Sequence, residues 1–201
     1  MSRFLLLALA SFVSVAMLSS CGPKAFVKGD YDEDVESENL LTDQWSETDM
    51  QKSVKELVDS LVGHPAIREA KRQPILMVTK LQNKTSEHID TQNITDMVTV
   101  ELMGRGRVTF VNKAAREDVA DEYDYQNSGM VSEETKKGPG GQISADYILD
   151  GRLDSIVQEA GNRKTVYYKL TLSLTNLKTN LMVWSNHKQM RKLYKKRSVG
   201  M

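Results

Sequence analysis

The chain has 201 residues, of which 27% are charged and 6% aromatic, and its 27 basic side chains balance its 27 acidic ones. A net charge of zero argues against a general nucleic-acid binder, which needs a cationic surface. The composition is globular, and the length allows one domain with its own core plus a tether.

The first 20 residues predict a signal peptide. Arg3 precedes an apolar run from Phe4 to Leu18, and this run is shorter than the roughly 20 residues that a membrane-spanning helix needs. Small residues follow up to Ser20, and the next residue, Cys21, is the only cysteine in the chain. A lone cysteine forms no internal disulfide, so a role other than cross-linking is indicated.

The stretch Leu18-Ser19-Ser20-Cys21 resembles the lipobox of bacterial lipoproteins. The resemblance implies cleavage between Ser20 and Cys21, a diacylglycerol on the thiol, an acyl chain on the new amine, and no other cofactor. One acyl chain binds a bilayer marginally, whereas two or more hold it stably. Gly22, rather than Asp, follows the cysteine, which by resemblance to the sorting rule of enteric bacteria favours the outer membrane.

Residues 21–45 are interpreted as a disordered acidic tether. They show no hydrophobic periodicity, and the stretch from Asp30 to Asp49 holds nine carboxylates and no basic residue. A segment with so few apolar side chains cannot offset the entropy of folding.

Helical spacing of apolar residues then begins. Met50, Val54, Leu57, Val58 and Leu61 share one face of a helix. Thr48 and Gln51 fit a capping box at its start, and Gly63 with Pro65 ends it.

A crossover unit follows. Residues 75–81 form a short apolar run that predicts a central strand, residues 82–89 a polar loop, residues 90–104 a helix, and residues 107–111 a second strand. Strand, helix and strand over this length predict two parallel strands. Asn112 is expected to cap a third helix over residues 113–123.

The last third predicts antiparallel strands after a polar loop at residues 124–142, which holds one helical turn at 132–136. Residues 146–158 form one long strand, residues 166–175 alternate with a period of two, and residues 181–187 form the final strand. Turns are expected at residues 161–162 and 178–180. The fold class is therefore α/β, with a small mixed sheet of about four to five strands flanked by helices in a domain over residues 46–190. A basic tail over residues 191–201 follows.

No catalytic or metal-binding pattern is present in the sequence. His64, His88 and His187 form no metal-spaced pair, and no phosphate-binding glycine loop or nucleophile elbow occurs. The carboxylates within residues 117–122 indicate a solvated helix face. We expect no enzyme, no catalytic residue, no metal ligand and no small-molecule substrate.

Several stretches, in this order behind a lipobox, resemble the LpoB family of penicillin-binding protein activators. The resemblance covers about residues 50–190. The stretches that carry it are Leu76-Met77-Val78 with Asn83-Lys84-Thr85, the helix Met97 to Gly106 before Val108-Thr109-Phe110-Val111, the segment Ser144-Ala145-Asp146-Tyr147-Ile148-Leu149-Asp150-Gly151, and the closing hairpin Leu170 to Trp184-Ser185.

The resemblance implies a domain similar to the N-terminal domain of TolB. It also implies an outer-membrane lipoprotein, anchored by its lipid and facing the periplasm, that binds a class A penicillin-binding protein and stimulates peptidoglycan synthesis. Nucleic acid is not an expected partner. Here the tether is short and acidic and lacks proline between Pro23 and Pro65, unlike the long proline-rich tethers of enteric members.

Two candidate partner surfaces and two alternative functions stay open. One surface is the loop at residues 124–142, and the other is a basic set, Lys188, Arg191, Lys195, Lys196 and Arg197. The alternative functions are a secretion lipoprotein similar to CsgG and a cell-wall-binding module using aromatic side chains such as Trp45, Tyr123 and Tyr125.

Overall fold

The computed structural model describes residues 34, 37–38 and 42–195. The predicted signal peptide, Ser20, Cys21, most of the predicted tether, Lys196 and Arg197 lie outside the described residues. Within the described part, none of the helices combines the length and the apolar character that crossing a membrane requires.

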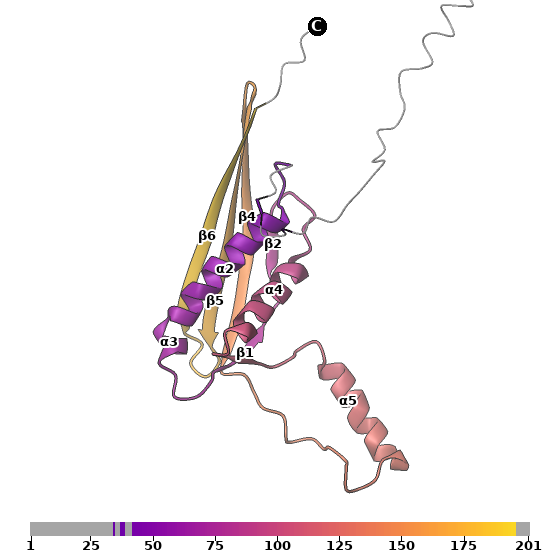
Figure 1. Cartoon of the computed structure of the whole chain (residues 1–201). Coiled ribbons are helices and arrows are strands. Elements are labelled where there is room, and N and C mark those ends of the chain that lie inside the picture. The colour runs from indigo at the N-terminus through magenta and orange to yellow at the C-terminus, as the bar shows by residue number, and fades with distance from the viewer. Residues whose placement is uncertain (1–33, 35–36, 39–41, 196–201) are drawn as a thin grey trace, which may run out of the picture. The chain divides into compact units, whose positions relative to one another are not determined.

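Helices and strands alternate in the first half of the domain, and long strands fill the second half (Figure 1). The elements are α2 (Glu47–Gly63), α3 (Pro65–Arg68), β1 (Ile75–Val78), β2 (Gln82–Lys84), α4 (Thr91–Gly104), β3 (Thr109–Phe110), α5 (Arg116–Tyr125), a π-helical turn η1 (Gln126–Met130), β4 (Tyr147–Ala160), β5 (Arg163–Asn176) and β6 (Met182–Lys195).

The strands form one mixed sheet in the order β3-β1-β4-β5-β6, with β2 paired to β4. Neighbours β3, β1 and β4 run parallel, whereas β4, β5 and β6 run antiparallel. The predicted α/β class and the parallel crossover through α4 are therefore confirmed. The sheet has six strands rather than four to five. The additional strand is β2, which lies within the predicted loop at residues 82–89 and pairs in parallel with residues 152–154 of β4.

The helix starts follow from side-chain caps. Ser46 precedes α2, and the Asp49 carboxylate accepts hydrogen bonds from its backbone N–H at 2.9 Å and its Oγ at 3.0 Å. The predicted capping box of Thr48 and Gln51 was therefore wrong by two residues, and Asp49 rather than Gln51 reaches back to the cap. The helix predicted over residues 90–104 is confirmed as α4, and Asp90 caps it by accepting from the N–H of Gln92 at 2.9 Å.

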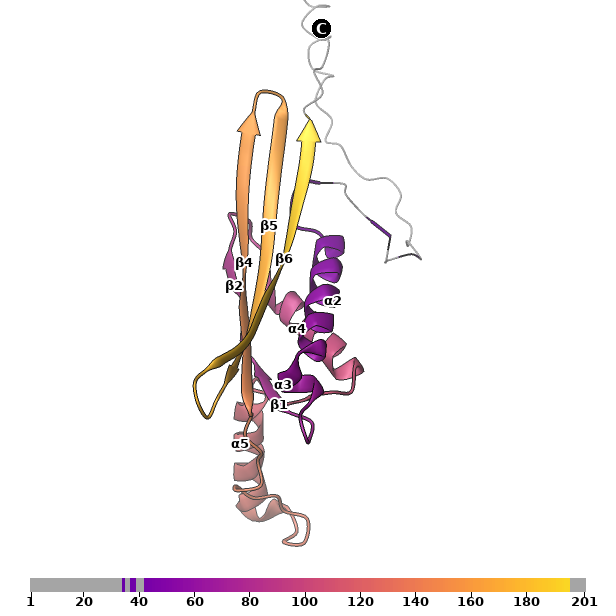
Figure 2. The ribbon, with the colours of Figure 1, turned by 90° about the vertical axis from the view of Figure 1, so that its left-hand side faces the viewer.

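The core lies between the sheet and the helices α2 and α4, which cover the same face (Figure 2). We call this the inner face and the opposite one the outer face. Leu57 and Leu61 of α2 and Leu102 of α4 are fully buried against strand residues such as Leu153. The backbones of β4 and β5 approach closely at Gly151. A Cβ atom at this position would lie 2.2 Å from the Thr171 carbonyl oxygen.

Strands β4, β5 and β6 each run for 14 residues and extend beyond the pairing with β2 (Figure 2). We call the outer part of this three-stranded sheet the arm: residues 155–160 of β4, 163–168 of β5 and 190–195 of β6. The predicted boundary of the basic tail is corrected here, because residues 191–195 are part of β6. The predicted tether also ends earlier than residue 45, since residues 42–45 contact the arm.

Candidate docking surface

Three members of the predicted basic set, Lys188, Arg191 and Lys195, lie on β6, where strand alternation divides them between the two faces of the sheet. Lys188 is on the inner face, where its ammonium forms an ion pair with Glu56 of α2. Arg191 is on the outer face, beside Tyr167 of β5. Lys195 is exposed at the end of β6. The set therefore does not form one continuous surface within the described residues.

A buried ion pair holds β6 to α2 on the inner face. The Lys192 Nζ lies 2.5 Å from the Asp49 carboxylate, and the two side chains are only 5% and 6% exposed. The same Nζ donates to the Gln44 carbonyl oxygen at 2.6 Å and lies 5.9 Å from the centre of the Tyr168 ring. The Lys192 ammonium is thus buried and paired inside the domain, although its sequence neighbours Arg191 and Leu193 are exposed.

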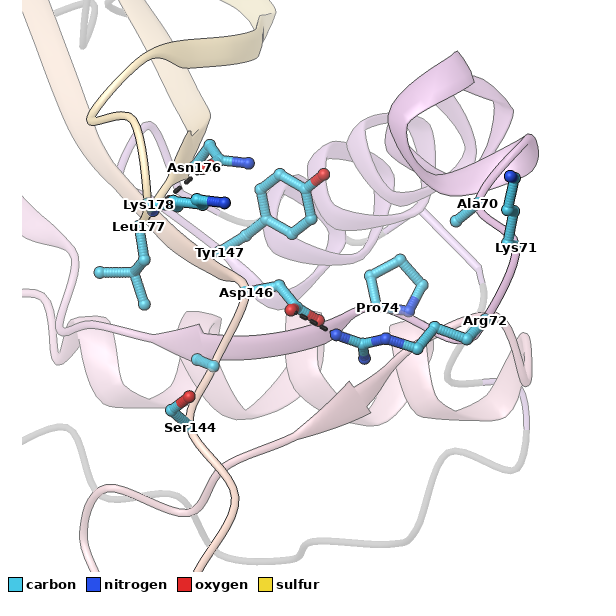
Figure 3. A pocket seen from close by; sticks show the side chains of 11 residues that line it. Ala70, Lys71, Arg72, Pro74, Ser144, Asp146, Tyr147, Asn176, Leu177 and Lys178 are labelled. Atoms are coloured by element: carbon cyan, nitrogen blue, oxygen red, sulfur yellow. Dashed lines mark hydrogen bonds and ion pairs between the residues drawn. The ribbon is translucent and has the colours of Figure 1, made fainter.

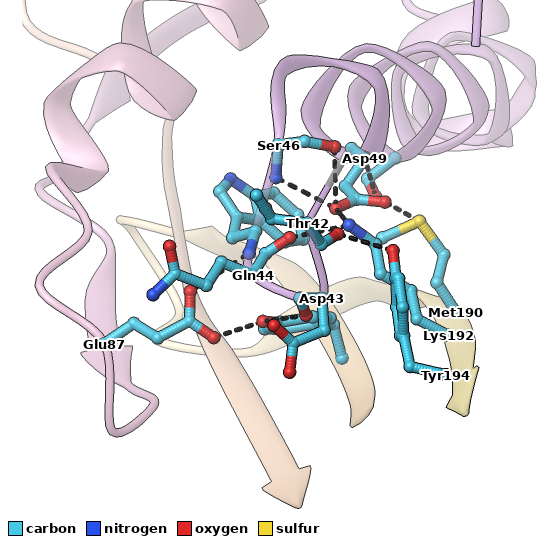
Figure 4. A network of polar contacts seen from close by, with 12 residues as sticks. Thr42, Asp43, Gln44, Ser46, Asp49, Glu87, Met190, Lys192 and Tyr194 are labelled. Atoms are coloured by element: carbon cyan, nitrogen blue, oxygen red, sulfur yellow. Dashed lines mark hydrogen bonds and ion pairs between the residues drawn. The ribbon is translucent and has the colours of Figure 1, made fainter. Parts of the chain in front are cut away.

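Residues 42–46, which we call the strap, cross the inner face of the arm (Figure 4). The Tyr194 hydroxyl donates to the Thr42 carbonyl oxygen at 2.5 Å, and Asp43 forms an ion pair with Lys164. The Trp45 ring packs edge-on against Tyr168 with ring centres 5.5 Å apart. Residues 42–45 of the strap therefore contact the inner face of the arm, and Ser46 contacts Asp49 of α2.

Titration behaviour in the strap follows from these partners. The hydrogen bond from Lys164 lowers the pKa of Asp43, and the same contact raises the pKa of Lys164. Burial raises the pKa of the Tyr168 phenol strongly, and the nearby Glu87 carboxylate, which accepts its hydrogen bond, raises it further. Glu87 also accepts from the backbone N–H of Trp45 at 3.0 Å. Two of the shifted groups, Asp43 and Lys164, therefore pair with each other across the strap and the arm.

The outer face of the arm is open and carries apolar side chains. Ile156 is 57% exposed and Leu193 is 75% exposed. Ile156 of β4 lies directly opposite Tyr167 of β5, and Leu193 of β6 lies opposite the next outer-face residue of β5, Thr165. A shallow hollow of about 580 Å³ joins them, lined by Ile156, Gln158, Thr165, Tyr167, Lys169, Arg191 and Leu193.

A second hollow, of about 590 Å³, lies at the opposite end of the sheet, beside Asp146 (Figure 3). The Asp146 carboxylate accepts from Arg72 at 2.6 Å and from the backbone N–H of Ile75 at 2.9 Å. Burial alone would raise the pKa of Asp146, but these two donors lower it. Asp146 thereby joins the start of β1 to the start of β4, which is a structural role.

Two of the three histidines make local contacts. His64 accepts the N–H of Ala66 through Nδ1 at 3.3 Å and so caps α3. The His187 Nε2 lies 2.6 Å from the amide of Gln189 on the same strand. In the part of the chain that the structure describes, no group of three or more His, Cys, Asp or Glu side chains is arranged to hold a metal ion.

The model of the LpoB family, described as peptidoglycan-synthase activator LpoB, matches residues 49–190. The chain belongs to the LpoB family. The match runs from the first turn of α2 to Met190 on β6, so it includes both helices of the core and five complete strands. Proteins of the LpoB family are outer-membrane lipoproteins that face the periplasm and activate peptidoglycan synthase.

Solved structures of the LpoB family are similar to this chain at low sequence identity. The LpoB C-terminal domains from Salmonella enterica and Escherichia coli are 14% and 16% identical, each with a TM-score of 0.44, and each match covers 71% of this chain and 98% of the other. The NMR structure of E. coli LpoB is 13% identical, with a TM-score of 0.41, and covers 89% and 86%. A comparison with curated proteins gave no match.

The family match does not test which residues of this chain bind a partner. It does not favour the alternatives of a CsgG-like secretion protein or a wall-binding module. Of the aromatic candidates for wall binding, Trp45 packs against Tyr168 in the strap, and Tyr125 is exposed at the end of α5. The apolar part of the exposed outer face of the arm was missed by sequence reasoning, because β6 was expected to stop at residue 187.

Proposed function

We propose that this protein is a lipid-anchored, non-catalytic activator that binds a class A penicillin-binding protein from the periplasmic side of the outer membrane. The observation that carries the proposal is the family match over residues 49–190, which makes the chain a member of a family of peptidoglycan-synthase activators. The class of the synthase and the anchor are the parts that need a test.

The anchor is assigned to Cys21. Leu18-Ser19-Ser20-Cys21 closes the predicted signal peptide, so cleavage after Ser20 would leave the cysteine as the first residue. A diacylglycerol on its Sγ and a third chain on its amine would hold the protein to one leaflet, because each buried CH₂ contributes about 0.8 kcal/mol. Mass spectrometry of the mature N-terminal peptide tests this assignment, and a free thiol on Cys21 would refute it.

A non-catalytic role is supported by how the titratable groups of the domain are used. The groups with shifted pKa values that pair with other charges, such as Asp43, Lys164 and Asp146, face structural partners. Lys192 and Asp49 neutralise each other in a buried pair. An activator needs none of these groups for chemistry, because it acts by binding.

The experiment is reconstitution of the full lipoprotein with purified class A penicillin-binding proteins of the same organism in detergent. Glycan polymerisation from lipid-linked precursor is measured with and without the lipoprotein. We expect a stable complex and a faster polymerisation rate. No complex with any class A synthase, together with an unchanged rate, would refute the proposed function.

A further inference from the structure

The outer face of the arm has the composition of a binding surface. Ile156, Tyr167 and Leu193 lie on adjacent rows of three neighbouring strands, and two of them are more than half exposed. Soluble domains seldom leave such apolar clusters open unless they bind something. Tyrosine and arginine are enriched among the residues that dominate binding energy, and here Tyr167 lies directly opposite Arg191.

The charge on this face is positive. Lys169 and Arg191 line the hollow, and strand alternation places Arg163 and Lys195 farther out on the same face. Arg163, Arg191 and Lys195 form no ion pair within the described residues. The one carboxylate among these rows is Asp154, which lies 3.1 Å from the Arg152 guanidinium and 3.7 Å from the Lys169 ammonium.

The strap covers part of the inner face of the arm (Figure 4). The cations on that side are paired with Asp49, Glu56 and Asp43. Within the described residues, the cations of the arm that form no ion pair therefore lie on the outer face. Strand alternation has thus sorted the basic residues into one set that holds the fold and one set that remains free.

The charge also selects the kind of partner. A second copy of this chain packed face to face would bring Arg191 and Lys169 close to the same cations of its mate, and like charges in an interface cost several kcal/mol. An acidic surface with an apolar centre complements both the cations and the exposed side chains of Ile156 and Leu193. Such a partner would gain in association rate as well as in specificity.

We propose that the outer face of the arm is the surface through which this domain binds its synthase, and that the matching patch on the synthase is acidic with an apolar centre. This inference rests on the proposed function and assigns its docking residues. Tyr167 and Arg191 lie at the middle of the surface, with Ile156 and Leu193 beside them.

The test uses the full lipoprotein in detergent, immobilised through a C-terminal tag, with the purified class A synthase that binds the unmodified protein. Arg191→Glu and Tyr167→Ala are each expected to weaken binding by tenfold or more, as truncation at a binding hot spot does. Lys178→Glu is the matched control, because Lys178 is an exposed lysine of the β5–β6 turn at the other end of the same hairpin.

Circular dichroism melting first tests whether each variant folds. If Arg191→Glu does not fold, Arg191→Gln takes its place. Unchanged affinity in both Arg191 and Tyr167 variants, with normal binding by the unmodified protein, would overturn the surface and leave the proposed function intact. An equal loss in Lys178→Glu would also overturn it, as would a dimer of the lipoprotein that Arg191→Glu dissociates. Failure of the unmodified protein to bind any class A synthase would remove the proposed function itself.

Discussion

Replacing Lys192 by methionine should be among the most damaging changes in the sheet. Lys192→Met keeps most of the side-chain volume but leaves the Asp49 carboxylate, which is only 6% exposed, without its cation. Removing one member of a buried ion pair costs about 3–5 kcal/mol, because the remaining charge stays desolvated. The strap also loses the hydrogen bond from Nζ to the Gln44 carbonyl.

Lys188→Met is the matched control, since Lys188 lies on the same strand and the same face and pairs with the exposed carboxylate of Glu56. An exposed pair contributes about 0–1 kcal/mol. Urea unfolding followed by the fluorescence of Trp45 and Trp184 gives both free energies of unfolding. In melting experiments each kcal/mol corresponds to about 2–4 °C for a domain of this size.

Asp49→Asn in the Lys192→Met background removes the remaining charge and should recover part of the loss, because the stranded carboxylate is its main source. The double variant keeps the experiment decisive if the single variant fails to fold. Losses in Lys192→Met and Lys188→Met that agree within about 0.5 kcal/mol would refute the reasoning, because burial would then make no difference to the two pairs.

Three further outcomes can be measured. Gly151→Ala should lose about 1–3 kcal/mol in urea unfolding, since its Cβ would lie 2.2 Å from a backbone oxygen, whereas Gly63→Ala, with open space around it, should lose nothing; equal effects would contradict the close approach. Leu57→Ala should lose about 2–5 kcal/mol because the side chain is fully buried, and a loss below about 1 kcal/mol would show that the site collapses on the cavity. The folded pKa of Asp146 is below its unfolded value of 3.8, so its contribution is present above that value and is lost as the pH falls through the folded pKa; Asp146→Asn should flatten the unfolding free energy between about pH 5 and pH 2, and an unchanged pH profile would contradict the role of Arg72 and Ile75.

The periodic elements could be predicted from the sequence because they bury one face. The apolar spacing of α2 and α4 and the alternation of β5 each require a partner layer, and the sheet supplies it. Asp90 and Gly63 mark helix ends by local chemistry, which does not depend on the rest of the chain. The parallel crossover followed from the length between β1 and β3.

Elements held by polar contacts could not be predicted. β2 has three exposed polar residues and pairs with β4 only because the fold brings it there. β6 continues past residue 187 through basic residues that resemble a tail in the sequence. The partners of Lys192 and Lys188, which are Asp49 and Glu56, lie more than 130 residues earlier in the chain. Arg191 and Lys195 were named from the sequence, but the apolar part of the docking surface was missed for the same reason, since this surface exists only when β6 reaches Lys195.

The division of the β6 cations between the two faces of the sheet separates the residues that stabilise the fold from the residues that are free to bind a partner. Substitutions at Lys188 and Lys192 are limited by the acidic residues of α2, whereas Arg191 and Leu193 can change without touching that helix. Partner preference could therefore be re-engineered by editing every second position of one strand. An insertion of a single residue before Arg191 would exchange the two faces, so that the Arg191 guanidinium would enter the interior and the Lys192 ammonium would lie in solvent.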